Sequence, residues 1–383
     1  MDGRLAMKLL YCIAGTYRPA GMERVLANKS RALVGMGYEV VVVTTEQKGR
    51  ANAFPFDPSI RFIDLGIGYE DNNGASFLDK VIHYPAKQRL HRKRLTEVLL
   101  REKPDVTVSM FCGEETFLPK IQDGSKKVLE IHFSRYKRLQ YGRKGLWAIA
   151  DRFRSWADLR HVRRFDKFVV LTQEDKEYWG GLDNIVVIPN ARTFTFDKPA
   201  ALDAKTVSAV GRYSEQKGLD LLIEAWKTLC DRVGKEALGW SLRLVGDGET
   251  RPLLQRMIEE YDLGATVTLH GPARDVKEIY ANTSILALSS RYEGLPMVLL
   301  ESQAAGVPAV SFACKCGPRD IIGDGRNGLL VPEGDTGGFA DALLRLMRDD
   351  ALRKAMGAEA YRMSDAWGEE KIMHRWKTLF GNL

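Results

Sequence analysis

The chain has 383 residues, of which 45% are hydrophobic and 28% are charged, and its formal net charge is +7. This composition is that of a folded protein with two or three domains, and no run of about 18 apolar residues that would cross a membrane occurs. The charge is uneven, because residues 1–200 carry 34 Lys and Arg against 24 Asp and Glu, whereas the rest carry 23 against 26. One half is therefore expected to meet an anionic surface or substrate.

The first half of the chain alternates apolar, strand-like runs with segments of helical period. A strand is predicted over 8–15, a helix over 21–37 and a strand over 38–46. Further strands are predicted over 105–111, 126–133, 167–172 and 185–190. Continuous β-branched runs separated by helices indicate a parallel sheet that is covered on both faces.

The same alternation restarts after a joint at 189–205, which contains two prolines and no clear period. Strands are predicted over 206–213, 241–248, 266–271, 284–290, 308–313 and 327–332, and a last helix over 369–380. The predicted fold class is α/β, with two Rossmann-like, doubly wound domains. The predicted domains are an N-terminal domain over 1–193, a C-terminal domain over 194–365, and a terminal segment over 366–383 that crosses back to the first domain. Ligands bind beyond the carboxyl ends of such strands, so the cleft between the domains is the expected site.

Five scattered cysteines and the N-terminal sequence bear on the cellular compartment. The first apolar run is short and lacks an A-x-A cleavage site, so it is not read as a signal peptide. The cysteines are interpreted as reduced thiols of a cytoplasmic protein. Cys314 and Cys316 form a C-x-C pair, but this is not the usual C-x2-C spacing and no second pair follows, which disfavours a redox or metal site.

The stretch "GRYSEQKG" (211–218) is the first candidate for chemistry. A strand is expected to end at Gly211, and Arg212 and Lys217 then lie in a loop before a helix that begins near Gly218. Two cations beside a helix N-terminus suit a diphosphate group. A solvated loop is the alternative, because Arg and Lys are usually exposed.

The stretch "RYEGLPMVLLESQAAGVP" (291–308) is the second candidate. Pro296 suits a first helical turn. Free backbone N–H groups that favour an anion are then expected around four neighbours: Gly294, Leu295, Met297 and Val298.

Two glutamates in this stretch, Glu293 and Glu301, lie eight positions apart. Glu301 falls within an apolar run, where an ionised carboxylate needs a partner. The hydroxyls of a ribose can supply two hydrogen bonds to one carboxylate. The alternative partner is an arginine of the core such as Arg291 or Arg319.

Two further places in the first half lie at or just beyond the carboxyl ends of predicted strands. His132 lies at the carboxyl end of a strand, and the alternative is a packed histidine bonded to backbone. Gly15 and Gly21 bracket a strand-to-helix turn, but the turn is not G-x-G-x-x-G and no acidic residue cleanly ends the next strand, so NAD binding is disfavoured. A glycine at a helix start still lets a substrate approach the backbone closely.

Taken together, these stretches resemble the retaining glycosyltransferases of family 4, which have the GT-B fold of two facing Rossmann-like domains with an interdomain cleft. The resemblance is carried by the E-x7-E of Glu293 and Glu301, by "GRYSEQKG" and by "NGLLVPEGD" (327–335). It extends through 21–47 to the bacterial polysaccharide and capsule members. Two departures occur: Ala20 stands where the family often has a glycine, and the common GPxE reads Gly-Pro-Arg-Asp at 317–320.

The resemblance implies a role for each motif residue. The donor-binding residues would be Gly21, Gly211, Arg212, Lys217, Gly294, Leu295, Pro296, Met297, Val298 and Glu301. The catalytic residues would be His132, Arg212, Lys217 and Glu293. In this scheme Arg212 and Lys217 hold the donor diphosphate, Glu301 binds the ribose, and Glu293 contacts the donor sugar. Gly21 would line the floor near the phosphates, and His132 would lie beside the reacting sugar.

The implied reaction moves a hexosyl unit from a nucleotide-diphosphate sugar, with UDP favoured over GDP, to a hydroxyl group with retention of configuration. No metal cofactor is implied, and the sequence contains no D-x-D pair. A front-face substitution, in which the donor phosphate helps to take the acceptor proton, is favoured over two flanking carboxylates. A sugar-nucleotide epimerase of the same fold and a non-catalytic nucleotide-sugar binder are the alternatives. Nucleic-acid binding is not expected, because no nucleic-acid module is recognised.

Two basic stretches of the first half, 80–103 and 135–167, mix Lys and Arg with Trp, Tyr, Leu and Phe. The second holds 11 Lys and Arg against 3 Asp. Such stretches can lie on anionic lipid, and the alternative is a pair of solvated amphipathic helices. The hypothesis is an acceptor glycan on a polyprenyl diphosphate at the inner membrane face, with the protein cytoplasmic and peripheral to that membrane.

Overall fold

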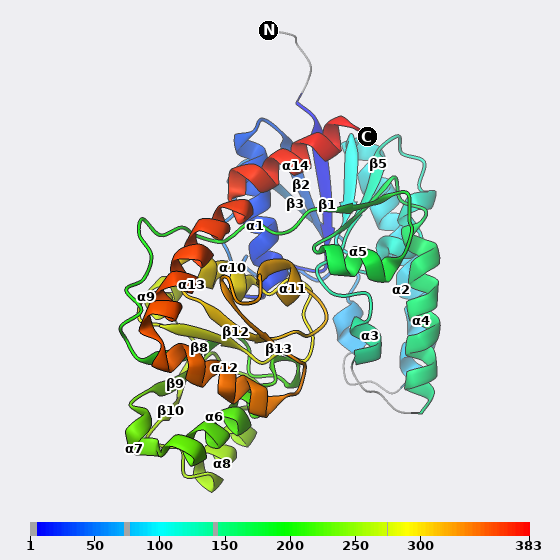
Figure 1. Cartoon of the computed structure of the whole chain (residues 1–383). Helices are drawn as coiled ribbons and strands as arrows, with labels where there is room; N and C mark the ends of the chain where they lie inside the picture. Colours follow the sequence, from blue (N-terminus) through cyan, green and yellow to red (C-terminus); the bar gives the residue numbers. More distant parts are fainter. Residues whose placement is uncertain (1–5, 73–76, 141–144, 274) are drawn as a thin grey trace. The chain divides into compact units, whose positions relative to one another are not determined.

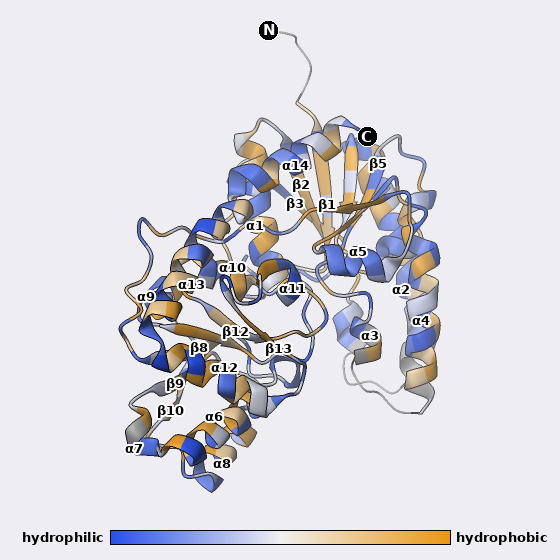
Figure 2. Ribbon diagram, viewed as in Figure 1, coloured by the Kyte–Doolittle hydropathy of each residue, from blue (hydrophilic) through white to orange (hydrophobic). Residues whose placement is uncertain are grey.

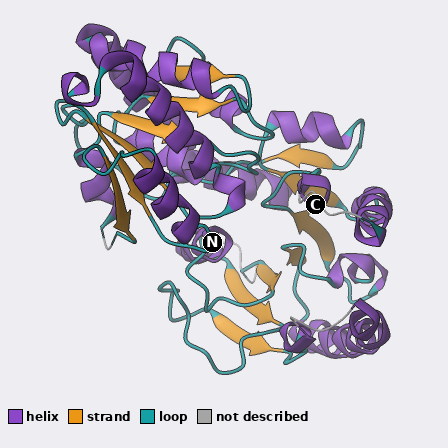
Figure 3. Ribbon diagram, turned by 90° about the horizontal axis from the view of Figure 1, so that it is seen from below, coloured by secondary structure: helices purple, strands orange, loops and turns teal. Residues whose placement is uncertain are grey.

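The computed structural model describes the chain except for residues 1–5, 73–76, 141–144 and 274. It divides into two compact units (Figure 1). Unit 1 comprises Met1–Leu171, Lys176–Pro189 and Glu369–Leu383, and unit 2 comprises Thr172–Asp175 and Asn190–Gly368. Each unit is built on one parallel sheet with helices packed on it (Figure 3), so the prediction of two Rossmann-like α/β units is confirmed.

The sheet of unit 1 has seven parallel strands in the order β3-β2-β1-β4-β5-β6-β7. Their bounds are β1 Lys8–Ile13, β2 Glu39–Thr44, β3 Arg61–Asp64, β4 Val106–Ser109, β5 Lys126–Glu130, β6 Lys167–Val170 and β7 Ile185–Val187. The central strands are almost wholly buried, as their continuous apolar runs predict. The edge strand β3 was not predicted, because "RFID" is short and three of its four residues are exposed.

The helices of unit 1 connect these strands and cover the sheet. They are α1 Gly21–Gly35, α2 Phe77–Glu102, α3 Lys137–Gln140, α4 Leu146–Val162, α5 Gln173–Trp179 and α14 Glu369–Gly381, with 3-10 turns η1 Tyr69–Asn72, η2 Glu114–Thr116 and η3 Leu118–Lys120. The first three residues of α5 belong to unit 2. The last helix, α14, packs against α1 although more than 300 residues separate them in the sequence.

The sheet of unit 2 has six parallel strands in the order β10-β9-β8-β11-β12-β13. Their bounds are β8 Thr206–Val210, β9 Ser241–Val245, β10 Val267–Gly271, β11 Ile285–Leu288, β12 Ala309–Phe312 and β13 Gly328–Val331. Each of the six strands predicted for the second half of the chain is present.

The helices of unit 2 enclose a second apolar core. They are α6 Leu219–Val233, α7 Lys235–Leu238, α8 Arg251–Glu260, α9 Val276–Ala281, α10 Met297–Ala304, α11 Pro318–Ile321, α12 Thr336–Arg348 and α13 Asp350–Met363, with 3-10 turns η4 Glu215–Lys217 and η5 Ser364–Trp367. Trp226 of α6 and Phe339 of α12 are fully buried in this core. The buried apolar residues of α6 and α12 belong to this core, as expected for amphipathic helices that cover a sheet, and both helices carry orange and blue segments in Figure 2.

Both sheets reverse their strand order at one place. In unit 1 this is between β1 and β4, and in unit 2 it is between β8 and β11. The loops that follow two such neighbouring strands leave in opposite directions and open a crevice, which is where ligands bind in open α/β sheets. In unit 2 these loops are 211–218 and 289–296, the two stretches that the sequence singled out.

Candidate functional site

The two loops at the switch point of unit 2 are joined by an ion pair. Lys217 Nζ lies 2.6 Å from Glu293 Oε1, and Ser290 Oγ donates to the same oxygen at 2.6 Å. Lys217 keeps about a fifth of its side chain exposed, whereas the Glu293 side chain is 7% exposed. The structure therefore brings together two predicted site residues that are 76 positions apart in the sequence.

Gly218 allows this close approach. It has a φ of +57°, and a Cβ at this position would lie 2.1 Å from the carbonyl oxygen of Ser289. The Ser289 hydroxyl in turn donates to the backbone oxygen of Lys217 at 3.0 Å. Any larger residue at 218 would have to push the two loops apart.

Arg212 and Gly211 lie at the end of β8, beside this ion pair. Gly211 is close to the Lys217 side chain, since a Cβ on it would lie 3.4 Å from the Lys217 Cε. Arg212 is exposed, and among the described residues it forms no ion pair. In this loop Lys217 is paired with a carboxylate, whereas Arg212 can bind an anion.

The N-terminus of α10 follows in the same loop. Pro296 is the N-cap residue, not part of the first turn as predicted, and Met297 begins the helix. No side chain of the described residues caps this end. Gly294 and Leu295 lead into it, and Val298 lies in the first turn. The free N–H groups of this turn can therefore meet an anion or a ligand hydroxyl.

Glu301 lies in the second turn of α10 and is 4% exposed. It accepts hydrogen bonds from two hydroxyls, Thr193 Oγ1 at 2.8 Å and Tyr280 OH at 2.9 Å. The arginines considered as partners are engaged elsewhere: Arg291 makes a two-pronged contact with Asp220, and Arg319 pairs with Glu174. The carboxylate therefore sits among hydroxyl donors, the same chemistry that a ribose would offer.

His132 lies in unit 1, two residues beyond β5. Its Nε2 atom is 3.1 Å from Glu130 Oε1, at ion-pair distance but without hydrogen-bond geometry. Glu130 is fully buried and also pairs with Lys29 of α1. Burial alone would raise the pKa of Glu130, but the charges of Lys29 and His132 outweigh burial and hold this pKa at about 2. The ring of Trp376 from α14 lies 4.1 Å from the Lys29 amine, so the last helix closes this buried cluster.

Replacing Lys29 with methionine is expected to destabilise the protein by about 3–5 kcal/mol, because it leaves Glu130 buried without its main cation. The double variant Lys29→Met/Glu130→Gln should recover most of this loss.

The pH dependence of the protein's stability should also reverse in Lys29→Met. In the wild type, the low pKa of Glu130 adds stability above the unfolded value of about 4.3, and this stability is lost as the pH falls. In Lys29→Met, burial raises that pKa, so stability falls as the pH rises. Urea unfolding at several pH values measures both effects, and equal stability of the single and double variants would contradict them.

Gly21 is the first residue of α1 and is exposed. A Cβ on it would meet no atom of the described protein within 4 Å. Ala20, the N-cap residue, offers no side-chain hydrogen bond. The space in front of this helix N-terminus is therefore open to a ligand, whereas packing within the protein gives no reason for a glycine here.

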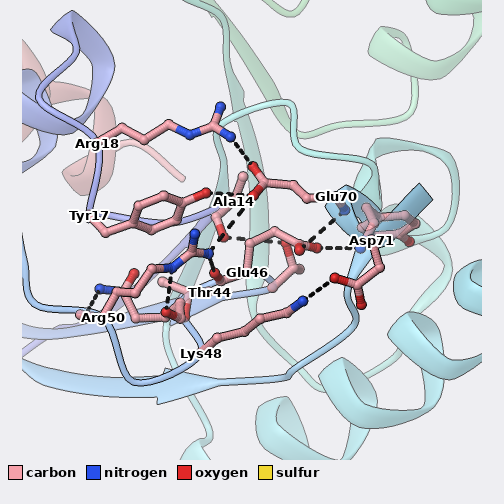
Figure 4. Close-up of polar contacts among 12 residues, drawn as sticks. Ala14, Tyr17, Arg18, Thr44, Glu46, Lys48, Arg50, Glu70 and Asp71 are labelled. Carbon is pink, nitrogen blue, oxygen red and sulfur yellow. Dashed lines mark hydrogen bonds and ion pairs between the residues drawn. The ribbon is translucent and has the colours of Figure 1, made fainter. Parts of the chain in front are cut away.

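A polar cluster beside the loop between β1 and α1 was not predicted from the sequence (Figure 4). Glu70 of η1 accepts from Tyr17 OH at 2.7 Å and from Arg18 at 2.6 Å, and the Arg50 guanidinium lies 3.3 Å from the centre of the Tyr17 ring. Glu46, just beyond β2, accepts from the backbone N–H groups of residues 69 and 70. The signal available was position alone, because the contributing loops follow β1, β2 and β3. The cluster gives the carboxyl edge of this sheet a rim of hydrogen-bonding side chains.

The C-x-C pair lies close to the unit 2 site but is buried. Burial raises the pKa of the Cys314 thiol well above its ordinary value, which keeps it protonated and unreactive. Within the described part of the chain, no group of three or more His, Cys, Asp or Glu side chains is arranged to hold a metal ion.

Comparison with protein families divides the chain in the same way. Residues 191–363 match the family described as glycosyl transferases group 1, and residues 19–192 match glycosyltransferase family 4. Over 224 residues the chain is 36% identical to the amylovoran biosynthesis glycosyltransferase AmsD of Erwinia amylovora, a match that covers 56% of this chain and 62% of AmsD. The chain thus spans less than two thirds of that relative.

A second relative is covered more fully. The lipopolysaccharide core biosynthesis glycosyltransferase LpsE of Rhizobium meliloti is 30% identical over 267 residues, which cover 68% of this chain and 71% of LpsE. The crystal structure of TarM matches with a TM-score of 0.79 at 15% identity, over 99% of this chain and 100% of TarM. At that identity the likeness concerns the fold, and it confirms the predicted GT-B class. From both family matches and the likeness to LpsE, the chain belongs to the family 4, group 1 glycosyltransferases.

Proposed function

We propose that the protein is a retaining glycosyltransferase that moves a hexosyl unit from a nucleotide-diphosphate sugar to a hydroxyl of a glycan or lipid-linked glycan in surface polysaccharide synthesis. The observation that carries this proposal is the Lys217–Glu293 pair at the switch point of unit 2, in the same loop as Arg212, which forms no ion pair with the residues that the structure describes. We further propose that the chain from residue 194 to 365 binds the donor and that residues 1–193 bind the acceptor.

The proposed chemistry follows from the charge of the leaving group. The bond between the anomeric carbon and the diphosphate breaks, and the nucleoside diphosphate leaves with its electron pair. Lys217, Arg212 and the N–H groups at the start of α10 would stabilise that charge. The acceptor oxygen bonds to the same face of the sugar, and a donor phosphate oxygen takes the acceptor proton.

The two glutamates receive different roles in this scheme. Glu293, held by Lys217 and Ser290, would contact hydroxyls of the donor sugar. Glu301, which already binds two hydroxyls, would bind the ribose. His132 would lie beside the reacting sugar, and Gly21 would leave room for the phosphates. A pair of flanking carboxylates, as in retaining glycosidases, is not part of the scheme.

UDP is proposed as the nucleotide. TarM of S. aureus has been crystallised with UDP, and Anabaena HepE with UDP and glucose. The names of AmsD and LpsE place those relatives in amylovoran biosynthesis and lipopolysaccharide core biosynthesis. By analogy, we propose a metal-independent, cytoplasmic enzyme that acts at the inner membrane face on a glycan carried by a polyprenyl diphosphate.

The test is turnover of UDP- and GDP-sugars with and without acceptors. The purified protein is incubated with each donor and with soluble or lipid-linked glycans in the presence of EDTA, and nucleotide release and glycan mass are measured. Acceptor-dependent release of UDP together with a glycan one hexose heavier is the expected result. An epimerised donor without acceptor would indicate an epimerase instead, and tight donor binding without turnover would indicate a non-catalytic binder.

A further inference from the structure

Helix α4 carries three large apolar side chains on its outer face, in addition to Leu159 and Val162, which pack into the core of unit 1. Ile149, Phe153 and Trp156 are 66%, 65% and 48% exposed. Asp151 and Asp158, on the opposite side, are 3% and 9% exposed. A helix on the surface of a globular protein normally shows the reverse pattern, with its apolar stripe turned inward. The outward apolar stripe therefore indicates a surface that binds another molecule.

The exposed residues form one continuous stripe. Positions 149, 153, 156 and 160 recur at helical spacing and lie along one face. The rings of Phe153 and Trp156 are in contact, with centroids 5.7 Å apart, and the Arg160 guanidinium lies 3.8 Å from the centre of the Trp156 ring. An apolar body edged by an arginine is suited to a boundary between hydrocarbon and water.

The exposed charge of this helix has a single sign. Between residues 148 and 164, every exposed charged side chain is an arginine: Arg152, Arg154, Arg160, Arg163 and Arg164. The two acids in this span, Asp151 and Asp158, face inward. Apolar and polar segments follow each other along α4 in Figure 2, where it runs down the edge of unit 1.

The neighbouring helix α3 also exposes an apolar side chain. Leu139 of α3, a helix that contacts α4, is 42% exposed. None of the described helices is both long and apolar enough to span a bilayer. The pattern is instead that of a helix lying in the plane of an interface.

We infer that this surface of α4, composed of Ile149, Phe153 and Trp156 with Arg152, Arg160 and the C-cap residue Arg163, binds an anionic lipid bilayer. The three apolar side chains enter the interface, and the arginines lie among the headgroup phosphates. A bilayer fits better than a folded protein partner, because all the exposed charge is positive and it flanks a narrow apolar stripe. The inference deepens the membrane-linked part of the proposed function by naming the surface that makes the contact.

The test is vesicle flotation of the full-length protein, without substrates. Vesicles of phosphatidylcholine alone are compared with vesicles that also contain phosphatidylglycerol, at low and high salt. We expect the wild type to float only with the anionic vesicles and to be released by salt. The triple variant Arg152→Gln/Arg160→Gln/Arg163→Gln should bind on the order of 100-fold more weakly, and Ile149→Ser/Phe153→Ser/Trp156→Ser should lose binding.

Matched controls remove the same groups from unit 2. Arg256, Arg345 and Arg348 are exposed arginines, and their joint change to Gln alters the net charge equally. Leu253→Ser removes a 40% exposed apolar side chain. Both controls should float like the wild type, and circular dichroism confirms that all variants are folded. Absence of wild-type binding, or equal binding by the α4 variants, overturns the inference.

Transfer to a water-soluble acceptor is measured in the same preparations. Because α4 lies outside the donor loops, its variants should keep the wild-type affinity for UDP, which calorimetric titration measures. If none of the proteins transfers sugar but the wild type still floats, the proposed function fails and the membrane surface stands. If transfer is normal but flotation is absent, the reverse holds.

Discussion

Lys217→Met is expected to lower kcat for sugar transfer by about 10²–10³-fold, since it removes a fixed cation from the developing charge of the leaving diphosphate. The change also leaves Glu293, which is 6% exposed, without its cation. The affinity for UDP should fall as well, because the product carries the same diphosphate. Steady-state kinetics and calorimetric titration with UDP measure the two effects separately.

Two further variants serve as controls for the effect of Lys217→Met on activity and stability. Lys227→Met removes a lysine that pairs with Asp231 on the outside of α6, and it should leave the kinetics unchanged. In Lys217→Met/Glu293→Gln the orphaned carboxylate is neutralised. If this double variant regains stability but not activity, the role of Lys217 in catalysis is separate from its role in holding Glu293. Activity of Lys217→Met close to that of the wild type would refute the diphosphate clamp.

Glu301→Ala is expected to weaken UDP binding by about 10- to 100-fold, which is the usual value of hydrogen bonds to a charged group. The sharper measurement uses nucleotides that lack one ribose hydroxyl. The wild type should bind UDP more tightly than 2′-deoxy-UDP or 3′-deoxy-UDP, and Glu301→Ala should not discriminate among the three. This double difference isolates the contact between carboxylate and ribose.

Thr193→Val is the matched control for this prediction. It removes the hydroxyl that donates to Glu301 Oε1 and keeps the shape of the side chain and the carboxylate itself. It should preserve the discrimination between UDP and its deoxy analogues. Thermal unfolding of both variants separates lost ribose contacts from the loss of the Thr193 and Tyr280 hydrogen bonds. Unchanged discrimination in Glu301→Ala would remove the ribose assignment.

The fold was largely readable from the sequence because most strands are buried on both faces. A run such as "EVVVVT" in β2 has no exposed side to interrupt it, so its apolar character is continuous. The edge strand β3 has mostly exposed residues and no such signal. The outward stripe of α4 lies in a stretch recognised as basic and amphipathic, but only the fold shows which face of the helix is covered.

The sequence proposes positions for the site, and their roles stay predictions, but it does not give the contacts between these positions. Strand ends and a helix start pointed to Lys217, Glu293 and Glu301. The direct pairing of Lys217 with Glu293 depends on how two loops that are distant in the sequence meet in the fold. Local sequence does not predict this contact. The same holds for Tyr280 and Thr193, whose hydroxyls reach Glu301 from other elements.

The return of α14 to unit 1 has a consequence for biosynthesis. Unit 1 contains residues 1–171 and 176–189, yet it also includes Glu369–Leu383, among them the buried Trp376. Unit 2 consists of the continuous segment Asn190–Gly368 and the short segment Thr172–Asp175. All of it precedes Glu369–Leu383 in the sequence. The segment that completes unit 1 is therefore synthesised after the segment that forms unit 2, and until Glu369–Leu383 are present the Lys29 amine lacks the covering ring of Trp376.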